Sequence, residues 1–363
     1  MTKKIDNKKL LRLLFVSSPV GTLGSGLTGG VELTLHNIAT EMRRRGHIIT
    51  IMAAKGSTAW EMPLIEIEGS LQISTQTQER DAPITLPASS VLANCWEYVR
   101  QAQTEYDLIV NFAYDWLPFY LTPFFNRPIA HLVSMASLTQ AMDQIIEQIA
   151  LQFPGTVAFH SQAQAATFTF ADRCRCVGNG INLSLYNFCP EPSDGIGWVG
   201  RIAPEKGLED AVAACQMTGI PLKIMGYLQN EGYWQQILRD YPDAPFEYAG
   251  FLNTTELQKC LGKCQALLMT PRWLEAFGNV AIEALACGVP VIAYRRGGPS
   301  EIIEDGKTGF LVEPDSVEGL VEAMGKLDQI DRYICRQRVE SEYSTTAMGG
   351  RIEQWFRDIL QKG

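Results

Sequence analysis

The sequence predicts an α/β protein made of two domains, each with a parallel β-sheet. The chain has 363 residues, and single hydrophobic cores rarely grow beyond about 250–300 residues. Short apolar runs alternate with segments of helical periodicity along both halves, which is typical of βαβ units. A proline-rich stretch at residues 187–195 separates the halves and is typical of an interdomain linker. We therefore expect domains over residues 1–188 and 189–344.

The first half opens with a βαβ unit. Residues 11–17 form a mostly apolar run, as expected of a buried parallel strand. Residues 31–45 place apolar side chains at helical spacing, and residues 47–53 form a second strand after Gly46. A polar stretch at residues 66–87 predicts an edge strand and a surface loop. The alternation continues with a helix at 89–103 and strands at 107–111, 128–133 and 156–160.

The second half repeats this pattern. Its strands are expected at residues 196–199, 222–225, 246–248 and 266–269. Closing helices are expected at residues 316–327, 332–342 and 345–360. The last of these carries a single apolar stripe, which consists of Met348, Ile352, Trp355, Phe356 and Ile359.

Composition and charge restrict the classes of partner. Hydrophobic residues make up 46% of the chain and charged residues 20%, as in an ordinary globular protein. The net charge of −9 argues against nucleic acid as a partner, because phosphate contacts need a basic surface. No apolar run approaches the ~18 residues of a membrane span. We therefore expect no strong membrane association and a cytoplasmic location.

Cysteine and histidine usage predicts no metal site. The nine cysteines are scattered and lie mostly within apolar segments, which is typical of reduced thiols. Their spacing does not match the paired pattern of zinc sites, and the chain has four histidines.

Two carboxylates in the stretch from Pro271 to Gly309 are the main candidates for function. Glu275 precedes a Phe-Gly turn, and Glu283 follows eight residues later, which we expect to be the start of an apolar helix. The backbone N–H groups at the start of that helix favour an anion. Carboxylates beside a bound anion would repel it unless they accept hydrogen bonds from hydroxyl groups on either side of it. A nucleotide sugar offers such hydroxyls, because its diphosphate lies between a ribose and a hexose. The alternative is that Glu283 only complements the helix dipole.

The run E-A-F-G-N-V-A-I-E-A-L-A-C-G-V-P-V-I-A resembles the E-x7-E signature of GT-B glycosyltransferases, in particular glycosyltransferase family 4. The resemblance implies two Rossmann-like domains that face a central cleft, with the C-terminal helix at 345–363 joined to the first domain. It also implies that Glu275 contacts hydroxyls of the donor sugar and that Glu283 contacts the ribose. The turn between them is expected to bind the donor through Phe277, Gly278, Asn279 and Val280.

A second motif of the same resemblance begins the second domain. Residues 200–207 read G-R-I-A-P-E-K-G and resemble the family's G-R-x-x-x-x-K-G segment. Its Arg and Lys hold the donor diphosphate, which implies this role for Arg201 and Lys206. Without a metal ion, a leaving nucleoside diphosphate needs fixed cations at its developing charge. The alternative is an ordinary surface Arg and Lys in a turn.

Further candidates follow from the resemblance alone. His131 aligns with a histidine near the reaction centre, although a packed strand histidine is the alternative. Asp115 and Trp116 are expected on the acceptor side. The remaining donor-side candidates lie in glycine-containing loops, namely Gly29, Gly30, Gly226, Tyr227, Phe251 and Leu252.

A dinucleotide-dependent dehydrogenase is a rival interpretation of the first loop. Residues 24–29 match G-x-G-x-x-G. However, these glycines begin several residues after the strand instead of directly at its end. The second strand also lacks the following acidic residue that would bind an adenosine ribose.

The resemblance implies retaining transfer of a hexose from a nucleotide sugar, with no cofactor, and UDP-glucose is the expected donor. The opening FVSSPVGTLGSGLTGGVELTLHNIA is similar to glucosyltransferases that act on tetrahydrobiopterin. This favours a small hydroxyl acceptor, and the alternatives are a lipid, sucrose-type or polysaccharide acceptor. A nucleotide-sugar epimerase or a non-catalytic binding protein is an alternative of another class. The sequence leaves the oligomeric state open.

Overall fold

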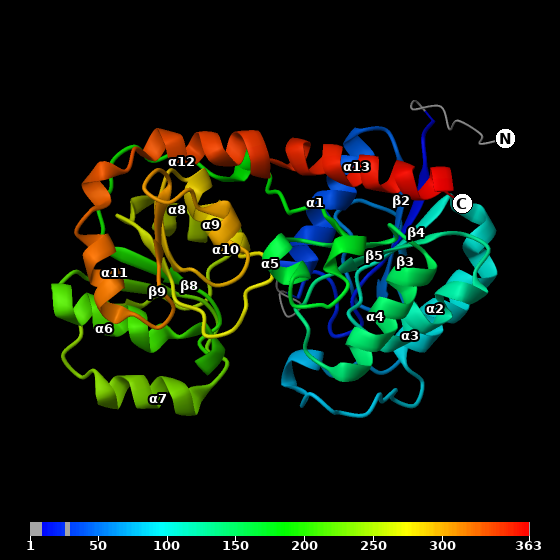
Figure 1. The fold of residues 1–363 in the computed structure, drawn as a ribbon, viewed down its shortest axis with the longest axis horizontal. Coiled ribbons are helices and arrows are strands. Elements are labelled where there is room, and N and C mark those ends of the chain that lie inside the picture. The colour runs from blue at the N-terminus through cyan, green and yellow to red at the C-terminus, as the bar shows by residue number, and fades with distance from the viewer. Residues whose placement is uncertain (1–8, 26–29, 363) are drawn as a thin grey trace. The chain divides into compact units, whose positions relative to one another are not determined.

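The computed structural model describes residues 9–25 and 30–362, which divide into two compact units (Figure 1). Unit 1 comprises the chain up to Gly180 together with the C-terminal residues from Met348, and unit 2 spans Ile181–Ala347. The division falls upstream of the boundary expected at residue 188. Ile181 and Tyr186 cause this difference, because both are buried in the core of unit 2.

Unit 1 is built on a seven-stranded parallel sheet with the order β3-β2-β1-β4-β5-β6-β7. Its strands are β1 (Arg12–Val16), β2 (Ile48–Ala54), β3 (Leu64–Ile67), β4 (Leu108–Asn111), β5 (Ile129–Val133), β6 (Val157–Phe159) and β7 (Arg175–Cys176). Its helices are α1 (Gly30–Arg44), α2 (Val91–Ala102), α3 (Trp116–Leu121), α4 (Gln140–Gln152) and α5 (Gln162–Ala165), and it also contains most of α13 (Thr345–Lys362).

Strand alternation explains why unit 1 needs helices on both faces of its sheet. Successive side chains of a strand point to opposite faces. Leu13 and Phe15 of β1 pack with helices α1 and α13, whereas Leu14 and Val16 pack with α2. The predicted apolar stripe of the C-terminal helix is confirmed, because all five of its residues are buried in the core of unit 1.

Unit 2 is built on a six-stranded parallel sheet with the order β10-β9-β8-β11-β12-β13. Its strands are β8 (Ile196–Val199), β9 (Leu222–Met225), β10 (Phe246–Tyr248), β11 (Leu267–Met269), β12 (Val291–Tyr294) and β13 (Gly309–Val312). Its helices are α6 (Leu208–Thr218), α7 (Glu231–Asp240), α8 (Thr254–Lys263), α9 (Asn279–Ala286), α10 (Pro299–Ile302), α11 (Val317–Met324) and α12 (Arg332–Arg338).

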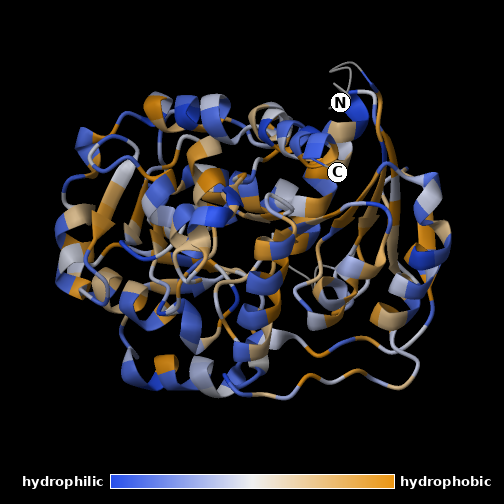
Figure 2. Ribbon diagram, turned by 45° about the vertical axis from the view of Figure 1, so that its right-hand side comes forward, coloured by the Kyte–Doolittle hydropathy of each residue, from blue (hydrophilic) through white to orange (hydrophobic). Residues whose placement is uncertain are grey.

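Helices also cover both faces of this second sheet. One core cluster joins the strands to α6, α7 and α11, and another joins them to α8, α9 and α12. The hydropathy colouring agrees with this arrangement, since apolar residues dominate the strands while the helices are apolar on one side and polar on the other (Figure 2). The predicted α/β class with two Rossmann-like sheets is therefore confirmed.

Local differences from the predicted elements have local causes. The short helix α3 and strand β7 were not predicted, because each is too short to show a period. The helix expected at 332–342 is α-helical over Arg332–Arg338 and continues as a π-helical turn over Val339–Tyr343. Among the described residues, no helix is both long and apolar enough to cross a membrane.

Candidate functional site

The carboxyl ends of strands β8 and β11 are where a ligand site is expected in unit 2. Starting from β8, the sheet grows to β9 and β10 on one side and to β11, β12 and β13 on the other. Open parallel sheets bind ligands where the strand order reverses in this way, outside the carboxyl ends of the strands. The loop after β8 carries Arg201 and Lys206, and the loop after β11 carries Glu275. The topology therefore brings the two predicted motifs together.

An ion pair joins these two loops. Lys206 Nζ lies 2.6 Å from Glu275 Oε2, and the two side chains are 18% and 19% exposed. The indole N–H of Trp273 also donates to Glu275 Oε2, at 3.1 Å. Burial opposes ionisation of Glu275, but Lys206 and the hydrogen bond from Trp273 outweigh it and hold the pKa of the carboxyl below its ordinary value. Glu275 therefore stays ionised at neutral pH.

Trp273 also contacts the two predicted cations, Arg201 and Lys206, through the face of its ring. Lys206 Nζ lies 4.6 Å from the centroid of the indole ring, and the guanidinium carbon of Arg201 lies 5.9 Å from it. Both separations are within cation–π range. Arg201 is further held by the side chain of Gln229 and by Glu205, whose Oε1 lies 3.1 Å from Nη2. The predicted grouping of Arg201, Lys206 and Glu275 is thus present in unit 2.

Glu283 lies in a different environment from Glu275. It is the fifth residue of α9, one turn inside the helix instead of at its start, and it is 8% exposed. The phenol of Tyr186 donates to Glu283 Oε1 at 2.8 Å. Burial raises the pKa of Glu283 to about 7, although the hydrogen bond from Tyr186 opposes this shift. The expectation that Glu283 lies beside the exposed helix end was therefore wrong.

The turn before α9 serves mainly to hold the Glu275 loop. Gly278 caps the helix, and Asn279 and Val280 are its first, partly exposed residues. The ring of Phe277 is buried and packs edge-on against Tyr343 at 5.9 Å. The donor contact expected of Phe277 cannot come from its ring, which is part of the core.

The Gly-Gly turn at residues 297–298 supports the same loop. The N–H of Gly298 donates to the carbonyl of Glu275 at 2.8 Å. Gly297 has a φ of 76°, and a Cβ built there would lie 2.3 Å from the same carbonyl oxygen. Any larger residue at position 297 would therefore push the Glu275 loop away.

Arg272 fixes the start of this loop from the other side. Its guanidinium pairs with Glu209 and Asp210 at 2.8 Å and with Asp315 at 3.2 Å. Its backbone N–H donates to the carbonyl of Glu205 at 2.9 Å, which ties the loop after β11 to the loop after β8. Trp273 is the next residue, so this network determines where the indole lies.

Two of the predicted donor-side loops follow strands β9 and β10. Tyr227 and Phe251 are 57% and 67% exposed, and Leu252 is partly buried. Gly226 is packed against backbone, because a Cβ built there would lie 1.9 Å from the carbonyl oxygen of Gly200. Gly226 therefore allows the two loops to approach each other, and the exposed aromatic rings are the groups available to a ligand.

His131 is the clearest correction to the predicted site. Its side chain is fully buried in β5 and stacks on Phe119 at a centroid distance of 4.2 Å. Asn111 Nδ2 lies 3.1 Å from Nδ1, and Thr122 Oγ1 lies 2.9 Å from Nε2. Burial lowers the pKa of His131 to about 3. Both ring nitrogens are occupied and no substrate can reach them, so His131 is a packed strand histidine.

The other unit 1 candidates lie at the corresponding edge of the first sheet. Asp115 and Trp116 follow β4, at the point where the strand order reverses between β1 and β4. Asp115 Oδ2 accepts a hydrogen bond from Gln72 at 2.9 Å, and burial raises its pKa. Trp116 stacks on Tyr120 at 4.4 Å. Gly30 is the first residue of α1, and Gly29 lies outside the described residues.

Comparison with known proteins shows which family unit 2, the unit with the ion pair, resembles. Residues 190–337 match the family described as Glycosyl transferases group 1. Unit 2 therefore resembles a glycosyltransferase domain of this family. The glycogen synthase of Mycobacterium tuberculosis is 32% identical over 163 residues, and sucrose synthase 6 of Arabidopsis thaliana is 39% identical over 73 residues. These matches cover 41% and 20% of this chain, and 38% and 8% of the two relatives, so the chain spans less than half of either protein.

Solved structures resemble nearly the whole chain. The Anabaena protein HepE, solved in complex with UDP and glucose, has a TM-score of 0.75 at 19% identity and covers 95% of this chain and 98% of its own. Sucrose-phosphate synthase from Thermosynechococcus elongatus has a TM-score of 0.77 at 18% identity and covers 97% and 100%. The two units therefore have the GT-B fold.

Three residues of unit 2 were missed by sequence reasoning. Trp273 lies two residues before Glu275, and an aromatic residue so close to a candidate carboxylate was an available signal. Arg272 and Tyr186 gave no such signal, because their partners are distant in sequence.

Glu283 should make the stability of the protein depend on pH. Its pKa is about 7 in the folded protein against an ordinary 4.5, so the folded state binds this proton more tightly. The contribution of protonated Glu283 to the free energy of unfolding is fully present below pH 4.5. It is lost as the pH rises to about 7. By linkage, the loss is about 3 kcal/mol. Glu283→Gln stays neutral, so its free energy of unfolding should exceed that of the wild type at pH 8 but not at pH 4.

Denaturant unfolding at both pH values measures this difference. Glu322→Gln is the matched control, because Glu322 is exposed on α11. If the two variants show the same pH dependence, Glu283 is not a strained buried carboxylate.

Proposed function

We propose that this protein transfers a hexose from a nucleotide sugar to a hydroxyl group of an acceptor. The observation that carries the proposal is the cluster of Arg201, Lys206 and Glu275 at the switch point of the second sheet. Two fixed cations suit a diphosphate, and a carboxylate beside them suits the hydroxyls of the sugar attached to it. The cations stabilise the leaving group, and the proposal includes no metal or cofactor.

We propose UDP-glucose as the donor. The Anabaena structure contains UDP and glucose on a similar fold, and the match of residues 190–337 covers the loops that would hold them. The exposed rings of Tyr227 and Phe251 would flank the base. The carboxylate of Glu283, oriented by Tyr186, would accept hydrogen bonds from the ribose.

The proposed transfer retains the configuration of the hexose. The bond between the anomeric carbon and the diphosphate oxygen breaks, and the acceptor oxygen bonds to the same face of that carbon. The acceptor proton passes to the leaving phosphate, so the products are UDP and the glycoside. Such a route requires no protein nucleophile, which agrees with the exclusion of His131 from the reaction.

The acceptor is proposed to be a small molecule with a hydroxyl group, and tetrahydrobiopterin is the first candidate. Asp115 and Trp116, at the carboxyl edge of the first sheet, offer a carboxylate and an aromatic face for it. A polysaccharide acceptor is the second candidate, because the relatives include a glycogen synthase and a capsular polysaccharide glycosyltransferase.

Incubation with UDP-glucose tests the proposed function. The purified protein should release UDP and add one hexose to an acceptor from a panel of reduced pterin, sucrose and glucans, as read by mass spectrometry. Conversion of UDP-glucose to another UDP-hexose would identify an epimerase. Binding of UDP without turnover on any acceptor would identify a binding protein, and either result contradicts the proposal.

Arg201 and Lys206 should differ in what they contribute. Replacing either residue by Ala should lower turnover roughly a hundred- to a thousandfold, as expected when one hydrogen-bond donor to the developing charge of the leaving group is lost. Arg201 is one-third exposed, so Arg201→Ala should leave stability nearly unchanged. Lys206→Ala leaves Glu275 without its cation in a mostly buried site and should also reduce the free energy of unfolding.

Turnover and urea unfolding of both variants measure this contrast, and Lys206→Ala combined with Glu275→Gln should restore stability but not turnover. Wild-type rates in the two single variants would remove these cations from the mechanism.

Glu283 and Glu275 should bind different parts of the donor, Glu283 the ribose and Glu275 the hexose. A hydrogen bond to a charged group is worth roughly 1.5–3 kcal/mol, so Glu283→Gln should weaken UDP binding about ten- to a hundredfold. Glu275→Gln should not weaken UDP binding, because UDP carries no hexose and the change frees Lys206 for the phosphates. It should nevertheless reduce turnover.

Calorimetric titration with UDP, together with single-turnover rates, distinguishes the two roles. If both variants lose UDP affinity equally, the carboxylates do not bind separate parts of the donor.

A further inference from the structure

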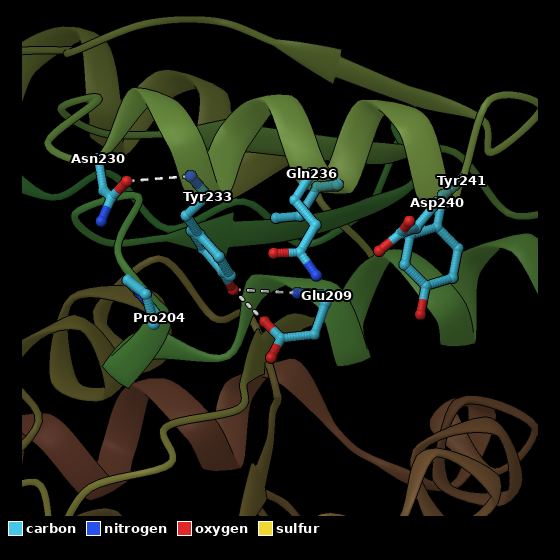
Figure 3. A pocket seen from close by; sticks show the side chains of 8 residues that line it. Pro204, Glu209, Asn230, Tyr233, Gln236, Asp240 and Tyr241 are labelled. Carbon is cyan, nitrogen blue, oxygen red and sulfur yellow. Dashed lines mark hydrogen bonds between the residues drawn. The ribbon is translucent and has the colours of Figure 1, made fainter.

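A cavity of about 460 Å³ lies in unit 2 between α6 and α7 (Figure 3). Its volume is within the range of small-molecule sites. Pro204, from the loop between Arg201 and Lys206, forms one wall. The polar lining consists of Glu209, Asn230, Tyr233, Gln236, Asp240 and Tyr241. Figure 3 shows the side chains of Tyr233 and Gln236 pointing from α7 toward Glu209 at the start of α6.

The charge of Glu209 is already compensated. Its Oε2 accepts a hydrogen bond from the phenol of Tyr233, and its Oε1 lies 2.8 Å from Nε of Arg272. Asp240, at the end of α7, is the remaining carboxylate of the lining. One exposed carboxylate is too little charge for a cation site, and the same uncompensated charge disfavours a phosphate.

The rest of the lining offers hydrogen bonds of both kinds. Among the described residues, the side chains of Gln236, Asp240 and Tyr241 have no hydrogen-bonding partner. The amide of Gln236 donates and accepts, the carboxylate of Asp240 accepts, and the phenol of Tyr241 donates. Hydroxyl groups also donate and accept, so this mixture is complementary to a polyol. The rings of Tyr233 and Tyr241 add apolar surface for the carbon face of a sugar.

We propose that this cavity binds a short neutral saccharide, separately from the nucleotide sugar. The inference rests on the proposed transferase function only for the choice of ligand. It gives the donor-binding unit a second sugar contact, which would hold part of a glycan acceptor or product.

Titration with maltotriose in the absence of any nucleotide tests the proposal. Calorimetry of the full chain should detect binding that is insensitive to salt. Gln236→Ala and Asp240→Ala should each weaken it roughly three- to tenfold, as expected for loss of one hydrogen bond. Gln235→Ala is the matched control, because Gln235 neighbours Gln236 but bonds Glu231 at 2.8 Å and does not line the cavity.

Several results would overturn the proposal. Absence of maltotriose binding would do so, as would an equal loss in the Gln235 and Gln236 variants. Salt-sensitive binding of spermidine instead of maltotriose would make the cavity a cation site. If maltotriose binds but no sugar is transferred, the proposed transferase function is wrong and the saccharide site is still supported.

Discussion

The ion pair between Lys206 and Glu275 is the interaction on which the candidate site depends. It joins the loops after β8 and β11, the two neighbouring strands between which the strand order reverses. Both side chains are about four-fifths buried, so neither charge is compensated by solvent if its partner is removed. The indole of Trp273 lies against Lys206 and Arg201 and donates to Glu275, so one aromatic side chain holds all three charged groups in place.

Two carboxylates that are close in sequence have opposite electrostatic environments. Glu275 faces an ammonium group and ionises readily, whereas Glu283 faces a phenol and has its pKa raised to about 7 by burial. Glu275 can therefore accept hydrogen bonds at any physiological pH. The charge of Glu283 near neutral pH depends on what binds beside it, since hydroxyl donors favour its ionised form. The pair is thus suited to two different parts of one ligand.

Much of the fold and part of the site followed from the sequence because their signals are local. Strand alternation and the stripe from Met348 to Ile359 are periodic patterns within one segment, and the structure confirms them. The environment of His131 depends on Asn111 and Thr122, which are separate in sequence, and that of Glu283 depends on Tyr186, 97 residues away. Periodic patterns within one segment of the sequence cannot predict such contacts between distant segments. The same holds for the network around Arg272, which pairs with three carboxylates from two distant segments.

A motif therefore mixes residues that can touch a ligand with residues that hold loops together. Gly226 and Gly297 lie where a side chain would collide with the backbone of Gly200 or Glu275, and the ring of Phe277 belongs to the core. Their identity is explained by packing without any ligand. Arg201, Lys206 and Glu275 are explained less well by packing, because partly burying two cations and a carboxylate at a loop edge costs solvation that apolar residues would avoid. That cost is why these three side chains, and not the glycines around them, carry the functional proposal.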